Sequence, residues 1–344
     1  PLVFVFIGLS PQKVPAQSFQ WGVIGGALNS MQTSGQWFRV KDLATYGNQR
    51  IYSRAMVGSW NLEVAGQKLP SFADLTLTEN VVSAFDEKGK HLWSKVIGSK
   101  SGSDIKGIFT DSLGNVYATG GIRGYKQHFH TDTVIRYFTV RDHPHTFMIK
   151  YDSTGSLQWL RQIEPDTVLE NSFVVSALLS PNQTIHWLCF MRKGHLGQYG
   201  DTVATEGFYV LRFDTKGNYL SKTLLNLQAG RPGRLVFDDP TQFRYDPQRG
   251  RYYIGGINDD INPLVVGQDT VIGRSYLAAF DTTGQVLWKR ESVEKGFPIP
   301  GTDLRDFNLD EKGNIYLTGE SGHQAVFFNN ITLTQLGLNA KKSA

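Results

Sequence analysis

Four of the eight histidines lie within a stretch of 18 positions and could bind a metal ion. They form two His-x-His pairs with two carboxylates nearby: His128, His130, His143, His145, Asp132 and Asp142. Residues two apart in an extended strand point to the same face, so a hairpin would turn the two pairs toward one another. Imidazole suits Zn, Cu or Ni, and carboxylates can complete the shell. This stretch is the candidate metal site of the sequence, and a solvated loop with chance histidines is the alternative.

A second set of acidic residues recurs along the chain instead of clustering. Each is followed three positions later by glycine: Asp86, Asp111, Asp152, Asp214, Asp281 and Asp310. One metal site would not need six copies, whereas an Asp carboxylate that accepts backbone N–H groups two residues on is typical of a tight turn. We therefore expect these carboxylates to cap turns. The recurring Trp93, Trp159 and Trp288 could be sugar-stacking platforms, but their equivalent places predict packing between copies of a repeat.

Signatures of catalysis are missing. The sequence contains no G-x-S-x-G, H-E-x-x-H or G-x-x-x-x-G-K-[ST], and no cofactor is predicted. The acid pairs Asp238-Asp239 and Asp259-Asp260 could act on glycosidic bonds only at a suitable separation. The single cysteine, Cys189, lies in an apolar stretch, so we expect a buried, unreactive thiol and no intrachain disulfide.

Two phrases that repeat along the chain organise the fold. DSLGNVYATGG at Asp111–Gly121 recurs 199 positions later as DEKGNIYLTGE at Asp310–Glu320. The phrase that follows it holds Asp86, Asp152, Asp214 and Asp281, at spacings of 66, 62 and 67. Each phrase reads as strand, turn and strand, with the glycine in a left-handed conformation that suits a G1 bulge. One period of about 66 residues thus predicts four strands, and such units must stack to bury their faces.

Five copies of the period are visible. They begin near Trp37, Asp104, Ser172, Arg234 and Asp303. The second carries an insert, Tyr125–His145, between its second and third strands. Related short elements occur at that place in several copies, and we expect them to form edge strands or loops on one rim: Thr131–Ile135, Gly200–Val203, Gln268–Ile272 and Asn330–Leu333. The fifth copy reaches Ala344 before its second phrase, so further chain is expected beyond it.

The first residues do not fit the period. Residues 1–17 combine a short apolar run with a polar stretch and Val14-Pro15-Ala16-Gln17, as in the later half of a secretory signal peptide. A buried first strand is the alternative. The next stretch, Ser18–Gly26, resembles the last strand of a copy without its turn, so it could complete a sheet begun at the other end of the chain and close a ring. We expect the repeat domain to span residues 18–344.

Composition sets further limits. The chain has 344 residues, of which 40% are hydrophobic, enough for a large core. A net charge of +4 with scattered Lys and Arg does not predict nucleic-acid binding. No apolar stretch is long enough to span a membrane as a helix.

Four strands per period with aligned turns predict an all-β fold, a β-propeller of four-stranded blades. The phrase at Asp111–Gly120 and Asp310–Gly319 resembles the SBBP-type, or seven-bladed, β-propeller repeat. The opening FQWGVIGG is similar to exported proteins of Bacteroidetes-like bacteria. A quinoprotein-type propeller is the rival resemblance, on Ala279–Trp288, but its period is shorter and the adjacent cysteines of many such enzymes are impossible here. A scaffold of that fold without cofactor stays open as an alternative.

The resemblance implies export by a Gram-negative bacterium, to the cell surface or the medium, and assigns no catalytic residue. We expect a non-enzymatic binding or scaffold domain of a larger protein, with an unidentified protein or glycan partner. The alternative is a carbohydrate-binding or carbohydrate-active propeller that uses its loop face, and fold alone does not decide between them.

Overall fold

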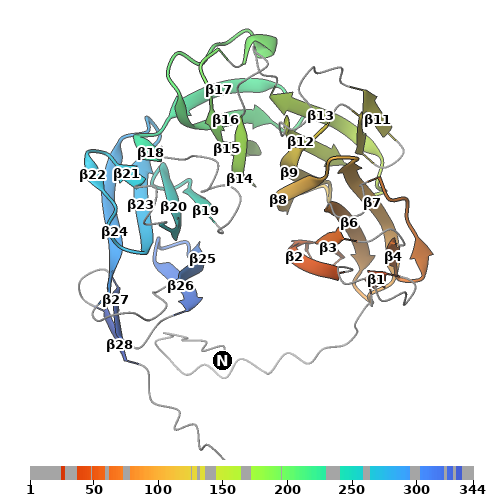
Figure 1. Cartoon of the computed structure of the whole chain (residues 1–344), viewed down its shortest axis with the longest axis horizontal. Helices are drawn as coiled ribbons and strands as arrows, with labels where there is room; N and C mark the ends of the chain where they lie inside the picture. Colours follow the sequence, from red (N-terminus) through yellow and green to blue (C-terminus); the bar gives the residue numbers. More distant parts are fainter. Residues whose placement is uncertain are drawn as a thin grey trace, which may run out of the picture. The chain divides into compact units, whose positions relative to one another are not determined.

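The computed structural model describes residues 25–27, 37–47, 49–58, 62–72, 78–124, 126–129, 132–135, 145–163, 172–194, 196–229, 241–258, 264–294, 303–320, 324–327 and 331–334. These residues form an all-β protein of several antiparallel sheets (Figure 1). Their only helical element is the short 3-10 turn η1, Gly197–Tyr199. The chain divides into two compact units, a first unit of Lys13–Lys222 and a second unit that holds the strands after Thr223. Residues 1–17, and with them the predicted signal peptide, lie outside the described residues.

In the first unit, each of three copies folds as an up-and-down sheet with its strands in chain order. The first sheet contains β2 (Trp37–Tyr46), β3 (Arg50–Gly58), β6 (Glu79–Asp86) and β7 (His91–Ser99). The second contains β8 (Ser103–Thr110), β9 (Val116–Ile122), β12 (His145–Tyr151) and β13 (Leu157–Ile163). The third contains β14 (Phe173–Leu179), β15 (Thr184–Met191), β16 (Gly207–Asp214) and β17 (Tyr219–Leu224).

The second unit follows the same plan. The strands of the fourth copy pair in chain order as β19 (Gln242–Asp246), β20 (Arg251–Ile257), β23 (Ser275–Asp281) and β24 (Val286–Glu294). A two-stranded sheet follows, with β25 (Asp303–Leu309) and β26 (Ile315–Glu320). In four copies, four antiparallel strands thus pair in chain order, as the sequence predicts, and copies 1, 2 and 4 carry a short hairpin in addition.

The turns within these sheets are built as the sequence predicts. At Asp111 the side-chain Oδ1 accepts the N–H groups of Leu113 and Asn115, each at 3.0 Å. The N–H of Gly114 donates to the carbonyl of Asp111 at 3.1 Å, and Gly114 is left-handed with φ +76°. The same bond from glycine to the Asp carbonyl closes the turns at Asp86, Asp152, Asp214, Asp281 and Asp310. The recurring carboxylates therefore serve as turn caps.

Neighbouring sheets of the first unit meet where a tryptophan of one covers a turn of the next. The indole Nε1 of Trp93 donates to the carbonyl of Ser153 at 3.1 Å, and that of Trp159 donates to Thr215 at the same distance. The two rings lie against Gly155 and Gly217, where an added Cβ would approach to 2.9 and 3.0 Å. The prediction that these tryptophans pack between copies is confirmed.

Four short hairpins, which we call the linking hairpins, join different copies. They lie between the second and third strands of copies 1, 2 and 4, and after the second strand of copy 5. They comprise β4–β5 (Leu62–Val64, Gln67–Lys68), β10–β11 (Lys126–Phe129, Asp132–Ile135), β21–β22 (Leu264–Val266, Asp269–Thr270) and β27–β28 (Gln324–Phe327, Ile331–Thr334). Each pairs with an element that precedes its own copy, namely β1 (Gly25–Ala27), β7, β18 (Leu227–Ala229) and β24.

Three of the four linking hairpins pair at the same offset from a preceding tryptophan. β10 pairs with the residues four to six positions after Trp93, and β27 with the residues four to six positions after Trp288. β4 pairs with Gly25–Ala27, which lie the same distance after Trp21. This register supports the prediction of a fourth strand before Gly25, although residues 18–24 lie outside the described residues. In the third copy a loop replaces the hairpin, and Gln198 Nε2 and Tyr199 Oη donate to the carbonyl of Gln162 at 2.9 and 3.0 Å.

The turn beneath Trp93 gives a direct test of this packing. In Gly155→Ala the new Cβ meets the indole and also strains a residue with φ +86°, whereas Gly200→Ala strains a similar φ of +71° with open space around it. We expect Gly155→Ala to lower the free energy of unfolding by about 2 kcal/mol more than Gly200→Ala does. Chemical denaturation measures both. Equal losses would show that the ring does not depend on the glycine.

Candidate functional site

The predicted histidine site is only partly within the described residues. His128 lies on β10, and its ring stacks on that of Phe72 with centroids 4.0 Å apart. His145 begins β12 in a different sheet and is buried. His130 and His143 lie outside the described residues, as do both acid pairs. No three His, Cys, Asp or Glu side chains gather around a possible metal position in the described part of the chain, and the metal site stays a prediction.

Among the repeated residues, Asp111 uses both oxygens of its carboxylate to hold its own turn, so it is not a candidate for catalysis. Besides the backbone bonds, its Oδ2 accepts from Asn115 Nδ2 and Tyr117 Oη, each at 2.8 Å, and Lys150 Nζ lies 3.2 Å away. Burial by itself raises the pKa of Asp111, but the hydrogen bonds from Asn115, Tyr117 and the backbone outweigh it and hold the pKa below its usual range. Burial also raises the pKa of the Cys189 thiol, which fits the predicted unreactive cysteine.

Charged side chains that take no part in these turns lie on the first strands β2, β8, β19 and β25, whereas β14 carries none. Four of the five first strands carry a one-residue register shift, or β-bulge, five positions before the turn residue. The extra residues are Lys41 on β2, Lys106 on β8, Val175 on β14 and Arg305 on β25. Since a bulge turns its extra side chain away from the regular alternation, it can present that side chain to a ligand.

The glycine that ends the repeated phrase makes room for the bulge. A Cβ at Gly120 would collide with the backbone of Asp104 and Ile105, and a Cβ at Gly319 would collide with the backbone of Asp303. The bulged strand therefore runs too close to the second strand for any side chain there. This steric requirement explains why the phrase Asp-x-x-Gly-Asn-x-Tyr-x-Thr-Gly ends in glycine.

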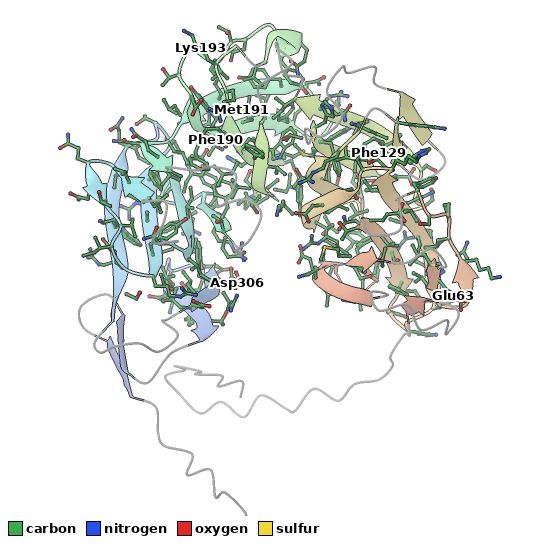
Figure 2. All side chains as sticks on the ribbon, in the orientation of Figure 1. Glu63, Phe129, Phe190, Met191, Lys193 and Asp306 are labelled. Atoms are coloured by element: carbon green, nitrogen blue, oxygen red, sulfur yellow. The ribbon has the colours of Figure 1, made fainter. Side chains whose placement is uncertain are left out.

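In the second unit, the bulged strand β25 holds an ion-pair network. Asp303 Oδ1 accepts from Arg274 Nε at 2.6 Å, and its Oδ2 accepts from Arg305 Nη2 at 3.0 Å. Asp306, which follows Arg305 and is labelled in Figure 2, accepts a hydrogen bond from Arg244 Nη2 of β19 at 2.8 Å. Three guanidinium groups thus pair with two carboxylates of β25.

The first unit has a related but weaker arrangement. Lys106 Nζ lies 2.6 Å from Asp104 Oδ2, across the bulge as in Arg305 and Asp303. Arg54 lies opposite Asp42 in the β2–β3 pair. Burial lowers the pKa of Arg54, and the carboxylates of Asp42 and Asp104 act in the opposite direction.

Sequence reasoning missed these first-strand charges, although a signal was present. Asp104-x-Lys106 and Asp303-x-Arg305 are separated by the same 199 positions as the repeated phrase. In both places the sequence shows a cationic residue two positions after an acidic one. Its meaning depends on the bulge, which sequence alone did not reveal.

Chemically, this arrangement can bind charged groups and hold them in fixed positions. The described residues define an all-β repeat protein with charged, bulged first strands, and no helix among them has the length and apolar character to cross a membrane.

A scan of protein-family models found no match, and a search of curated proteins found none. Among solved structures, the chain is similar to a protein of unknown function from Bacteroides caccae. That match has 11% sequence identity and a TM-score of 0.39, and it covers 74% of this chain and 69% of the other. At this level the similarity assigns neither a family nor a function.

The Asp111 network predicts a pH-dependent stability. Because the pKa of Asp111 is lowered on folding, its contribution is present at neutral pH and is lost as the pH falls through that lowered value. We expect Asp111→Asn to lower the free energy of unfolding by about 1–3 kcal/mol at pH 7. The difference from the wild type should begin to shrink below about pH 4, where the carboxyl protonates in the unfolded chain, and should vanish below the lowered pKa of the folded protein. Denaturant titrations from pH 7 to pH 2 test this, with the exposed Glu311→Gln as control; a constant difference would contradict it.

Proposed function

We propose that the chain is an exported, non-catalytic binding or scaffold domain, built as a β-propeller whose blades are the repeated four-stranded sheets. The strand order within each sheet supports this proposal, because a blade is an up-and-down sheet of four strands. Contacts between sheets support it as well. One buried cluster joins residues of the first and second sheets, such as Tyr52 and Tyr151, and another joins β20, β23 and β25 in the second unit. The sequence of residues 1–17 supports export.

The observation that carries the binding role is the division of polar groups into two kinds. The repeated aspartates and tryptophans hold turns and neighbouring sheets together, so they are engaged in the scaffold itself. Charged groups that vary from copy to copy lie on the first strands, where Lys41 is exposed and Asp306 is 52% exposed. In a propeller the first strand of each blade lies nearest the axis, so Lys41 and Lys106 of the neighbouring strands β2 and β8 would line one surface of the first unit.

A carbohydrate ligand is the second candidate. Trp93 and Trp159 each donate to a neighbouring turn and cover a glycine, which argues against their use as sugar-stacking platforms. Charged first-strand groups instead favour recognition of a sugar through hydrogen bonds and ion pairs.

Binding arrays of peptides and glycans, probed with the full chain, test the proposal. We expect a ligand that is lost when the two first-strand cations of the first unit are removed together, as Lys41→Gln and Lys106→Gln. The control carries Lys88→Gln and Lys216→Gln, at exposed turn tips, and should bind as the wild type does. Equal thermal midpoints would show that both variants are folded. A ligand that both variants retain would place binding elsewhere on the protein, and a complete absence of ligands would argue for a scaffold role alone.

A further inference from the structure

We propose that Trp288 and Arg290, which we call the Trp–Arg pair, bind a peptide β-turn: an Asp-x-x-Gly turn at the tip of a β-hairpin, presented by a partner protein. Both residues lie on β24, the last strand of the fourth copy, in the second unit. The inference goes beyond the proposed function, because it concerns a different surface and does not involve the first-strand cations Lys41 and Lys106.

The second copy shows what such a pair binds, because Trp159 and Arg161 on its last strand hold a turn of the third copy. Trp159 Nε1 donates to the carbonyl of Thr215 at 3.1 Å, and Arg161 Nε donates to the carbonyl of Gly217 at 2.6 Å. A Cβ at Gly217 would come within 3.0 Å of the indole and 3.1 Å of the guanidinium. The pair therefore recognises two backbone carbonyls and a left-handed glycine, and none of these contacts involves a side chain of the turn.

The Trp–Arg pair of the fourth copy has the same geometry. Trp288 packs edge-on to Tyr253 with ring centroids 5.9 Å apart and 61° between the planes, and the corresponding values in the second copy are 5.7 Å and 60°. The guanidinium carbon of Arg290 lies 5.8 Å from the centroid of the Trp288 ring, against 5.4 Å in the second copy. In both copies Nη1 of the arginine donates to the carbonyl of the residue before it, at 3.0 Å. The binding conformation is thus already formed on β24.

The donors that would contact the turn are accessible in the fourth copy. Arg290 is exposed, whereas Arg161 is half-buried. In the part of the chain that the structure describes, neither Trp288 Nε1 nor Arg290 Nε has an acceptor. The ring of Trp288 itself packs on a buried cluster that includes Leu277 and Phe307. The indole is therefore held in place by packing while its N–H stays available, as for an indole that binds a partner through its polar edge.

Turns of this type elsewhere in the described residues already have a partner. The last strand of each of the first three copies contacts a turn of the following copy, through Trp93, Trp159 and Thr223 at the turns of Asp152, Asp214 and Asp281. The glycine of the described turn in the fifth copy, Gly313, lies against Arg249. The turn that fits the Trp–Arg pair therefore comes from another polypeptide.

The preformed pair lowers the cost of binding, because its side chains lose little further freedom. A charged guanidinium also forms a stronger hydrogen bond to a carbonyl than a neutral donor does. One donor is missing relative to the second copy, where Lys150 Nζ also donates to the Thr215 carbonyl at 3.1 Å, since the fourth copy has Ala279 at that place. We expect a dissociation constant on the order of 100 µM for an isolated hairpin.

A cyclic peptide of residues Gly207–Leu224 tests the site. It reproduces the hairpin of β16 and β17 that Trp159 and Arg161 hold, and its closure keeps the two strands paired. We would titrate the labelled peptide with the full chain and follow its fluorescence anisotropy, and we expect saturable binding. The peptide with Gly217→Ala should bind about tenfold or more weakly, because its Cβ would meet the indole. The peptide with Lys216→Ala, at the exposed tip of the turn, should bind as the unchanged peptide does.

Variants of the full chain then locate the site. Arg290→Ala and Trp288→Phe, which keeps a ring without the N–H, should each weaken peptide binding by about tenfold or more. Arg290→Ala should leave the thermal midpoint unchanged. Arg161→Ala is the matched control, because its turn is already bound: it should lower the thermal midpoint by about 2 °C or more and bind the peptide as the wild type does. The variant with Lys41→Gln and Lys106→Gln should also bind the peptide normally, so this site and the proposed first-strand site are tested separately.

The opposite effects expected for the two arginines decide between an open and a filled site. If Arg290→Ala lowers the thermal midpoint as much as Arg161→Ala does and the peptide does not bind, the site is filled by the chain itself and the proposal is wrong. Absence of peptide binding, or equal affinity for the Gly217→Ala peptide, would also overturn it. Sedimentation of the full chain identifies one possible partner: a dimer that Arg290→Ala abolishes would support the site and show that a second copy supplies the turn.

Discussion

A tryptophan ring resting on the glycine of the next turn is the contact on which the first unit depends. One four-stranded sheet exposes two faces and cannot bury both, so its stability comes from its neighbours. Trp93 and Trp159 meet this need with apolar area, and their indole N–H groups find carbonyl partners at Ser153 and Thr215. The glycines beneath these rings have a left-handed backbone and lie in van der Waals contact with the ring. The turn and the packing therefore both require a residue without a side chain. In the second unit Trp288 packs edge-on to Tyr253, with ring centroids 5.9 Å apart.

The parts of the fold that follow from local rules could be read from the sequence. An Asp whose carboxylate bonds forward, followed by a left-handed Gly, specifies a turn within four residues, so Asp111 and Gly114 identified a hairpin without knowledge of its surroundings. Alternating flanks then predicted the strands, and the period predicted the four strands that pair in chain order in each copy. Hairpins of the following copies extend two of these sheets to six strands. Packing of Trp93 and Trp159 between copies was predictable because equivalent residues of a repeat meet equivalent surroundings.

What could not be predicted depends on register and on segments far apart in the chain. A bulge shifts pairing by one residue, and nothing in the residues around Lys106 or Arg305 specifies that shift except the glycine opposite, which belongs to another strand. Arg274 and Asp303 are separated by 29 positions, and a fold was needed to bring them together. Likewise, His128 looked like a metal ligand because of its neighbours in sequence, yet its ring stacks on Phe72 of the preceding copy.

The linking hairpins also bear on how such a chain can grow. Each hairpin belongs by sequence to one copy and pairs with an element that precedes that copy. A tandem duplication of one period would therefore include its own linking hairpin, which can pair with the end of the preceding copy. The number of copies can change in evolution without the invention of a new interface.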